Sequence, residues 1–286
     1  MPTCTVLAVW RPIDRRRSGR PFCRSPSAWS FYGSFTNHVM EALRGQVQEL
    51  HSIVGELDEH QLAAASACQG WSVSDVLLHL SQTNELAATS ARGQLAAGEW
   101  APADRQVRTD IDDIAGGAVE RDRGATGTAV RARWLNSADD MIAALEACGP
   151  ATRVQWVAGG MAARTLATTR IAETWIHTGD VCAGLGVEQP RSDRIWHIAR
   201  LVHRTLPYAF LRAGRHAEGK VCFEVTSPTH ETVVWRFGDG DAETVIRGSA
   251  LDLCRVAGQR ATPTDTSLKG AGPDADSVLA LMRTFA

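Results

Sequence analysis

The spacing of the apolar residues changes once along this chain of 286 residues, near Gly214, and that change constrains the fold more than any other feature. Before Gly214, apolar positions recur every three or four residues, as they do on one face of an α-helix. After it, residues 221–225 and 232–237 alternate or are rich in β-branched types, a pattern that predicts strands. We therefore expect an α+β fold of two domains, a helical bundle over residues 37–213 and a small α+β domain over residues 218–286.

Turn residues divide the helical pattern before Gly214 into segments that predict separate helices. One of them opens at Ser72, which can cap a helix, and Asp75 three residues later completes a capping box. The segments are about 39–57, 72 onward, 102–147 with a break near Gly124, 161–181 and 192–211. After the two strands we expect a third strand near 243–247, a short strand at 267–270, and helices at 249–257 and 274–285.

The first residues of the chain, 1–36, are rich in arginine, serine and proline and have no sustained periodicity, which predicts a disordered extension. Two interpretations of this extension remain open. Translation of the native protein could begin at Met40, or the extension could be a basic arm that binds an anionic partner.

Overall composition favours a small molecule as the partner. The formal charge of −2 supplies no basic field for nucleic acid or an anionic membrane, and no apolar run is long enough to span a bilayer. The seven cysteines are scattered and odd in number, which favours a reducing cytoplasm. Only Lys220 and Lys269 are lysines among the 30 basic residues, a bias that is typical of GC-rich bacterial genomes.

A carboxylate and two imidazoles form a candidate metal site. Glu173 and His177 are four residues apart, so they lie one turn apart on the same helix face, and Asp180 shares that face. His79, in the middle of an amphipathic helix, is the natural third ligand. Three protein ligands leave a fourth position open, which is the pattern of catalytic zinc, although nickel, iron or manganese would accept the same ligands.

The spacing alone leaves a structural interpretation equally open. A glutamate and a histidine four residues apart occur often by chance, and a histidine on an apolar face is commonly a core residue that hydrogen-bonds a neighbour. Arg170 and Asp180 would then form an ion pair on the helix face, or support the ligands from behind.

Two motifs resemble those of a known family. Residues 70–80 read G-W-S-V-S-D-V-L-L-H-L, which resembles the G-W-x-x-x-D-x-x-x-H-L signature of the mycothiol-dependent maleylpyruvate isomerase family. Residues 170–180 are similar to the family's R-x-x-E-x-x-x-H-x-x-D segment. The resemblance implies a DinB-like four-helix bundle with His79, Glu173 and His177 as metal ligands.

The resemblance extends into the carboxy-terminal part and covers about residues 40–286. Residues 248–253 and 256–260 are similar to the family's G-x-A-x-D-L followed by an arginine that helps catalysis. Arg260 is the closest match, but Gln259 departs from the usual G-R ending, and Arg255 is a nearby competitor. An arginine at the edge of a domain can also be merely solvated.

Together these features predict a metal-dependent enzyme that uses a low-molecular-weight thiol. A bound zinc would hold mycothiol as a thiolate for isomerisation or S-transfer, with Arg260 binding a carboxylate of a small substrate. The alternatives are a thiol-independent hydrolase or lyase of a biosynthetic pathway and a non-catalytic metal-binding protein. Cys68 and Cys182 are poor rivals as nucleophiles, because neither has a histidine at an evident partnering distance in sequence and buried structural cysteine is the commoner state.

Overall fold

The computed structural model describes residues 35–95, 111–156 and 159–284. The expected disordered extension therefore lies outside the described residues, apart from residues 35 and 36, which belong to the first helix. The first part of the segment expected at 102–147 and residue 285, the last of the helix expected at 274–285, also lie outside them; residues 282–284 are described and follow the end of the helix at Leu281.

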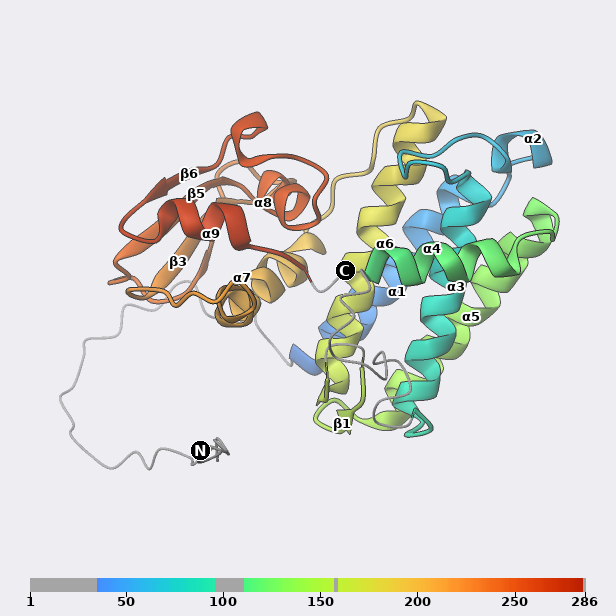
Figure 1. Ribbon diagram of the computed structural model, residues 1–286, viewed down its shortest axis with the longest axis horizontal. Helices are drawn as coiled ribbons and strands as arrows, with labels where there is room; N and C mark the ends of the chain where they lie inside the picture. Colours follow the sequence, from blue (N-terminus) through green and yellow to red (C-terminus); the bar gives the residue numbers. More distant parts are fainter. Residues whose placement is uncertain (1–34, 96–110, 157–158, 285–286) are drawn as a thin grey trace, which may run out of the picture. The chain divides into compact units, whose positions relative to one another are not determined.

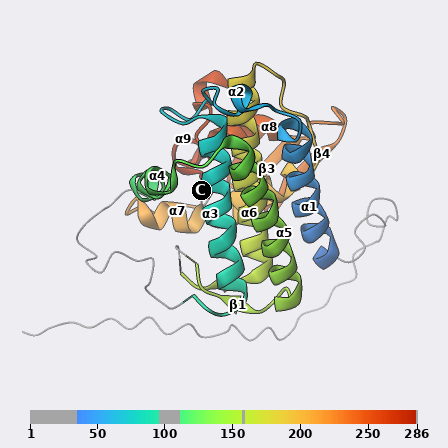
Figure 2. The same cartoon turned by 90° about the vertical axis from the view of Figure 1, so that its right-hand side faces the viewer.

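The helical part is a bundle in which four long helices run alongside one another (Figure 2). Helix α3 packs against α5 and α6, and α1 packs against α5 and α6. Two further helices are short or lie at the edge: α2, which was not expected from the sequence, and α4, which packs against α3. Their bounds are α1 Phe35–Val54, α2 Glu59–Leu62, α3 Val73–Ala91, α4 Ile111–Asp122, α5 Gly127–Cys148 and α6 Ala163–Leu185.

Local sequence explains where these helices begin and end. The side chain of Ser72 accepts a hydrogen bond from the backbone N–H of Asp75, and the carboxylate of Asp75 accepts one from the N–H of Ser72, so the predicted capping box is confirmed. Helix α6 ends at Gly186, whose φ of 68° lies in the left-handed region that favours glycine. The apolar faces bury Leu43, Trp134 and other side chains completely.

The segment before α6, for which the sequence pattern predicts no strand, contains a short hairpin. Strands β1 (Arg153–Val154) and β2 (Met161–Ala162) pair antiparallel, and each has only two residues. A strand this short has no alternation that a sequence pattern could reveal.

The carboxy-terminal part is a four-stranded sheet in the order β4-β3-β5-β6 with helices packed against it (Figure 1). Strands β3 and β5 are parallel, whereas β4 and β6 pair antiparallel with their neighbours. Helix α8 contacts β3 and β5, and α9 contacts β5 and β6. The bounds are β3 Val221–Thr226, β4 Val234–Phe237, β5 Thr244–Ser249, α8 Ala250–Ala257, β6 Lys269–Ala271 and α9 Ala275–Leu281, with a 3₁₀ turn at Pro263–Asp265. The predicted order of strands and helices is confirmed.

The two faces of this sheet differ in polarity. Phe223 and Ile246 are completely buried, and Trp235 nearly so. On alternate positions Glu224 lies opposite Arg236 on one side and Arg247 on the other, and it forms ion pairs with both. One face is therefore packed against the core and the other is covered by charged pairs across the strands.

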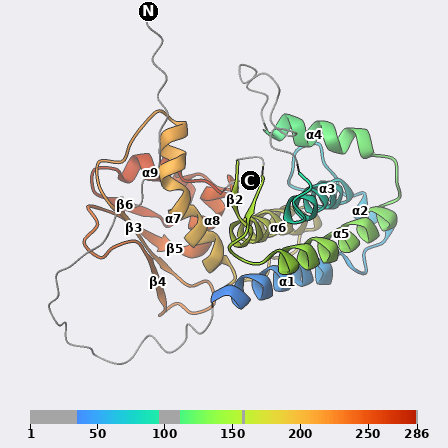
Figure 3. The same ribbon diagram turned by 90° about the horizontal axis from the view of Figure 1, so that it is seen from below.

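Helix α7 (Ile195–Arg212) connects the bundle to the sheet (Figure 3). It contacts α6 of the bundle, and it also contacts α8, α9 and β4. At the end of α8, a Cβ on Gly258 would lie 2.9 Å from a side-chain carbon of Ile176 on α6, so this close approach requires glycine. Within the described residues, no helix is both long and apolar enough to cross a membrane.

Candidate metal centre

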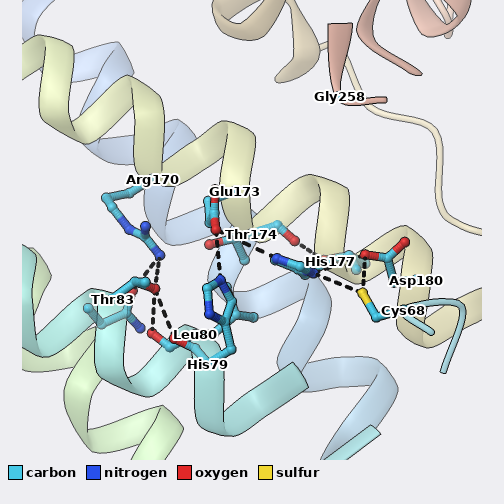
Figure 4. Close-up of polar contacts among 12 residues, drawn as sticks. Cys68, His79, Leu80, Thr83, Arg170, Glu173, Thr174, His177, Asp180 and Gly258 are labelled. Carbon is cyan, nitrogen blue, oxygen red and sulfur yellow. Dashed lines mark hydrogen bonds and ion pairs between the residues drawn. The ribbon is translucent and has the colours of Figure 1, made fainter. Parts of the chain in front are cut away.

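The structure brings the three predicted ligands together between α3 and α6 (Figure 4). The Nε2 atom of His79 lies 2.9 Å from Oε1 of Glu173, and the Nε2 atom of His177 lies 3.6 Å from the same oxygen. The three ligand atoms all lie within 4.8 Å of one another. All three side chains are nearly buried, with between 9% and 12% of their surface exposed.

These distances fit a divalent ion. Ligand atoms of a four-coordinate zinc lie about 3.4 Å apart when the bonds to the metal are about 2.1 Å long. Two imidazole nitrogens and one carboxylate oxygen are also a donor set that zinc, nickel, iron and manganese accept. His79, Glu173 and His177 could therefore hold one ion between them and leave a coordination position for a further ligand.

Burial and hydrogen bonding set the charge of the first two groups. Burial lowers the pKa of His79, and the neighbouring charge of His177 lowers it further against the opposing effect of Glu173. Burial alone would raise the pKa of Glu173, but its hydrogen bonds with His177 and His79 outweigh this and hold that pKa well below its usual value. A neutral imidazole and an ionised carboxylate are the forms that bind a metal.

His177 is oriented by Asp180. Its Nδ1 atom lies 2.9 Å from Oδ2 of Asp180, and because a carboxylate only accepts, the Nδ1–H donates this hydrogen bond. The donation directs Nε2 of His177 towards Glu173. Burial opposes a charged ring, but the bonds to Asp180, Cys68 and Glu173 prevail and raise the pKa of His177 well above its usual value. A metal ion at Nε2 of His177 would compete with a proton for that nitrogen. Binding of the metal ion is therefore favoured at higher pH.

Asp180 is in turn held by Arg260 from the carboxy-terminal part. Nε and Nη2 of Arg260 donate to the two carboxylate oxygens of Asp180, each at 2.7 Å, and Nη1 donates to the carbonyl of Gly258. Burial would raise the pKa of Asp180, but the hydrogen bonds from Arg260 and His177 outweigh it and lower that pKa. Arg260 thus lies beside the three candidate ligands, with its guanidinium on Asp180. That it also binds a substrate carboxylate stays a prediction.

Arg170 lies one turn before Glu173 and is buried, with 2% of its surface exposed. Its Nη2 atom donates to Oγ1 of Thr83 and Oδ1 of Asn84, which places the guanidinium against α3. One interpretation of the sequence was an ion pair between Arg170 and Asp180. Among the described residues this ion pair is not formed. Burial lowers the pKa of Arg170, and the charge of Glu173 counteracts this.

Cys68 belongs to the site, although its sequence neighbourhood contains no histidine. Its thiol donates to Oδ2 of Asp180 at 3.1 Å, and its sulfur lies 3.7 Å from Nδ1 of His177. The backbone N–H of Ala67 donates to the carbonyl of Asp180, which fixes this loop on α6. Cys182, by contrast, is buried, and burial raises the pKa of its thiol to about 11.

The packing of the loop explains why Cys68 was missed. Cys68 and Asp180 are 112 residues apart, and the only local signal is that Cys68 directly precedes the motif that begins at Gly70. The motif's Trp71 reaches the site as well, with its ring centroid 5.2 Å from that of His79. The described cysteines, which are Cys68, Cys148, Cys182, Cys222 and Cys254, are all free.

Comparison with known proteins points to the same family as the two sequence motifs. Residues 43–182 match the family model of the mycothiol maleylpyruvate isomerase N-terminal domain. Two proteins described as uncharacterized, from Mycobacterium tuberculosis strains CDC 1551 and H37Rv, are each 28% identical over 246 residues, which cover 85% of this chain and 93% of theirs.

Among solved structures, the fold resembles the crystal structures of a mycothiol-dependent maleylpyruvate isomerase and of one of its mutants. Each superposes with a TM-score of 0.55 at 16% sequence identity, over 83% of this chain and 95% of the other. At this identity the likeness concerns the fold, and it confirms the expected α+β class.

Proposed function

Because residues 43–182 match the family model of the mycothiol maleylpyruvate isomerase N-terminal domain, we propose that this protein is a metal-dependent enzyme that uses a low-molecular-weight thiol. Mycothiol is the proposed thiol, zinc the proposed metal, and isomerisation or S-transfer on a small carboxylate-bearing molecule the proposed reaction. The free cysteines of the described residues accord with the reducing cytoplasm that the sequence favours.

One observation carries the proposal: the ligand atoms of His79, Glu173 and His177 meet within 4.8 Å in a nearly buried site. Bringing two imidazoles and a carboxylate into the interior is costly unless they are paired or bind a metal. Three protein ligands with room for a fourth are typical of catalytic rather than structural zinc.

When bound, a zinc ion supplies Lewis acidity that lowers the pKa of a thiol coordinated to it. The chain's own residues set the charge of Glu173 and the orientation of His177 for this. Glu173 stays ionised, and Asp180 holds the His177 ring with Nε2 directed inwards. Arg260 fixes Asp180 through both carboxylate oxygens, so it acts as a positioning residue that links α6 to the carboxy-terminal part.

The first experiment measures metal content and thiol binding in the full-length protein. We expect about one equivalent of a divalent metal after purification, and calorimetric binding of mycothiol but not of glutathione. His177→Ala is expected to lose both metal and mycothiol. His216→Ala, which removes an exposed histidine outside the site, is the matched control and is expected to retain both.

The outcomes test the site and distinguish thiol-dependent from thiol-independent function. Metal content that His177→Ala does not change would contradict the site itself. Binding of metal without either thiol would favour a thiol-independent hydrolase or lyase. Binding of metal and mycothiol with no turnover of any maleylpyruvate-like substrate would show a thiol-dependent protein with another substrate.

A further inference from the structure

A pocket of about 380 Å³ lies between α6 and α7, away from the metal centre. Its lining includes the guanidinium-bearing side chains of Arg164 on α6 and of Arg200 and Arg204 on α7. Its apolar wall includes Met161 and Leu201. A volume of this size accommodates a small organic molecule.

The three arginines have no acidic partner among the described residues, whereas several other described arginines do. Elsewhere Arg133 pairs with Glu85, and Arg260 pairs with Asp180. Arg200 and Arg204 are also four residues apart on one helix, a spacing at which like charges destabilise the helix. Partial burial lowers the pKa of Arg200, and the positive charges of Arg204 and Arg164 lower it further. The three side chains are exposed, and together they place positive charge at this pocket without an acidic partner among the described residues.

The other polar groups of the pocket do not neutralise this charge. Burial lowers the pKa of His197 to about 4, and the charge of Arg200 contributes to the shift, so this imidazole is neutral near pH 7. The guanidinium of Arg200 lies 5.8 Å from the ring centroid of Trp196, a cation–π contact that leaves its charge in place. The pocket is thus cationic, with an aromatic and aliphatic wall.

This pocket and the metal centre lie on opposite faces of α6. Arg164 precedes Glu173 by nine residues, and Thr168 of the pocket precedes His177 by nine residues. At about 100° per residue, nine residues correspond to half a turn beyond two full turns. A ligand in the pocket therefore cannot touch the metal ligands, and the two sites can be tested separately.

We propose that the pocket between α6 and α7 binds a small organic dianion, whose two negative charges are held by Arg164, Arg200 and Arg204. Guanidinium groups bind such oxygens through paired hydrogen bonds, and three of them match more than one negative charge. The aromatic and aliphatic wall accepts an apolar body attached to the charged group. Phosphate monoesters and dicarboxylates share this chemistry.

The test is calorimetric titration of the full-length protein with phenyl phosphate and with phthalate, using benzamide as the neutral analogue. Titrations are run on the protein as purified and again after treatment with a chelator, because an anion could also bind a metal. We expect binding of at least one dianion in both preparations, weakening with added salt, and no binding of benzamide. The dianion that binds more tightly distinguishes the phosphate from the dicarboxylate source.

Arg200→Gln and Arg204→Gln are expected to weaken dianion binding about tenfold each. Arg121→Gln, on α4 and outside the pocket, is the matched control and is expected to bind like the unmodified protein. Without ligand, Arg204→Gln is expected to unfold at the same or a higher temperature, since one repulsive charge is gone.

Three results would overturn the proposal. The first is that neither dianion binds at millimolar concentration, and the second is that binding disappears after chelation. The third is that Arg200→Gln and Arg121→Gln bind equally well. A lower unfolding temperature for Arg204→Gln would show that Arg204 stabilises the fold through a partner. That result would contradict the proposal, which depends on Arg204 having no acidic partner.

Discussion

Replacing Asp180 by asparagine tests how the metal centre is oriented. Asp180→Asn keeps the shape of the side chain but removes the negative charge that accepts from Nδ1 of His177 and from two nitrogens of Arg260. The amide group has one acceptor oxygen, so it cannot serve both partners as the carboxylate does. We expect His177 to be held less firmly and to be a weaker metal ligand.

The magnitude follows from these contacts. Loss of a group that orients a metal-bound histidine typically weakens metal affinity by about 10- to 100-fold, which is about 1.4–2.7 kcal/mol. The substitution should also lower the free energy of unfolding of the metal-free protein. Removing one partner of a buried pair costs about 3–5 kcal/mol, but 37% of the Arg260 side chain is exposed, so we expect about 2 kcal/mol.

Zinc affinity is measured by competition with a chromophoric chelator, and unfolding by urea titration of the chelated protein. Asp140→Asn is the matched control, because Asp140 also binds an arginine, Arg92, through two oxygens, but 51% of its side chain is exposed. The control is expected to lose less than about 0.5 kcal/mol and to bind zinc normally. Unchanged zinc affinity in folded Asp180→Asn would refute the orienting role of Asp180.

Four further outcomes are expected. Arg260→Gln leaves the buried carboxylate of Asp180 without its guanidinium partner. It should lower the free energy of unfolding in urea by about 2 kcal/mol, after allowance for the exposure of Arg260. An unchanged urea midpoint would mean that this ion pair does not stabilise the packing of the carboxy-terminal part on α6. Ser72→Ala removes the cap that binds the N–H of Asp75, so the unfolding free energy should fall by about 1 kcal/mol, and no fall would show that another group caps α3. Trp134→Ala empties a completely buried position and should cost about 3–5 kcal/mol in the same urea assay, whereas a loss below 1 kcal/mol would show that the core refills the space. Chelation should lower the unfolding temperature, because a metal present at about a thousand times its Kd stabilises the native state by about 4 kcal/mol; equal temperatures with and without chelator would argue against a bound metal.

The sequence predicted local features of the fold well and non-local contacts poorly. The cap at Ser72, the glycine end of α6 and the alternation in β3 and β4 depend on residues within a few positions of each other, and the structure has all of them. The two-residue strands β1 and β2 and the single turn of α2 were missed, because elements this short contain less than one period of any pattern.

The same distinction applies to the candidate metal site. Helical periodicity determined that Glu173 and His177 share a face, because four residues span about one turn. The place of His79 in an amphipathic helix made it the natural third ligand, and resemblance to a family supported this choice across the 94 residues that separate it from Glu173.

Tertiary packing alone decided what surrounds these ligands. It placed Arg260 on Asp180 across 80 residues of sequence and brought Cys68 beside His177 across 109. It also gathered Arg164, Arg200 and Arg204 around a pocket on the other face of α6. Periodicity fixes the direction in which a side chain leaves its own helix, but the partner that it meets depends on how helices, loops and sheet pack together.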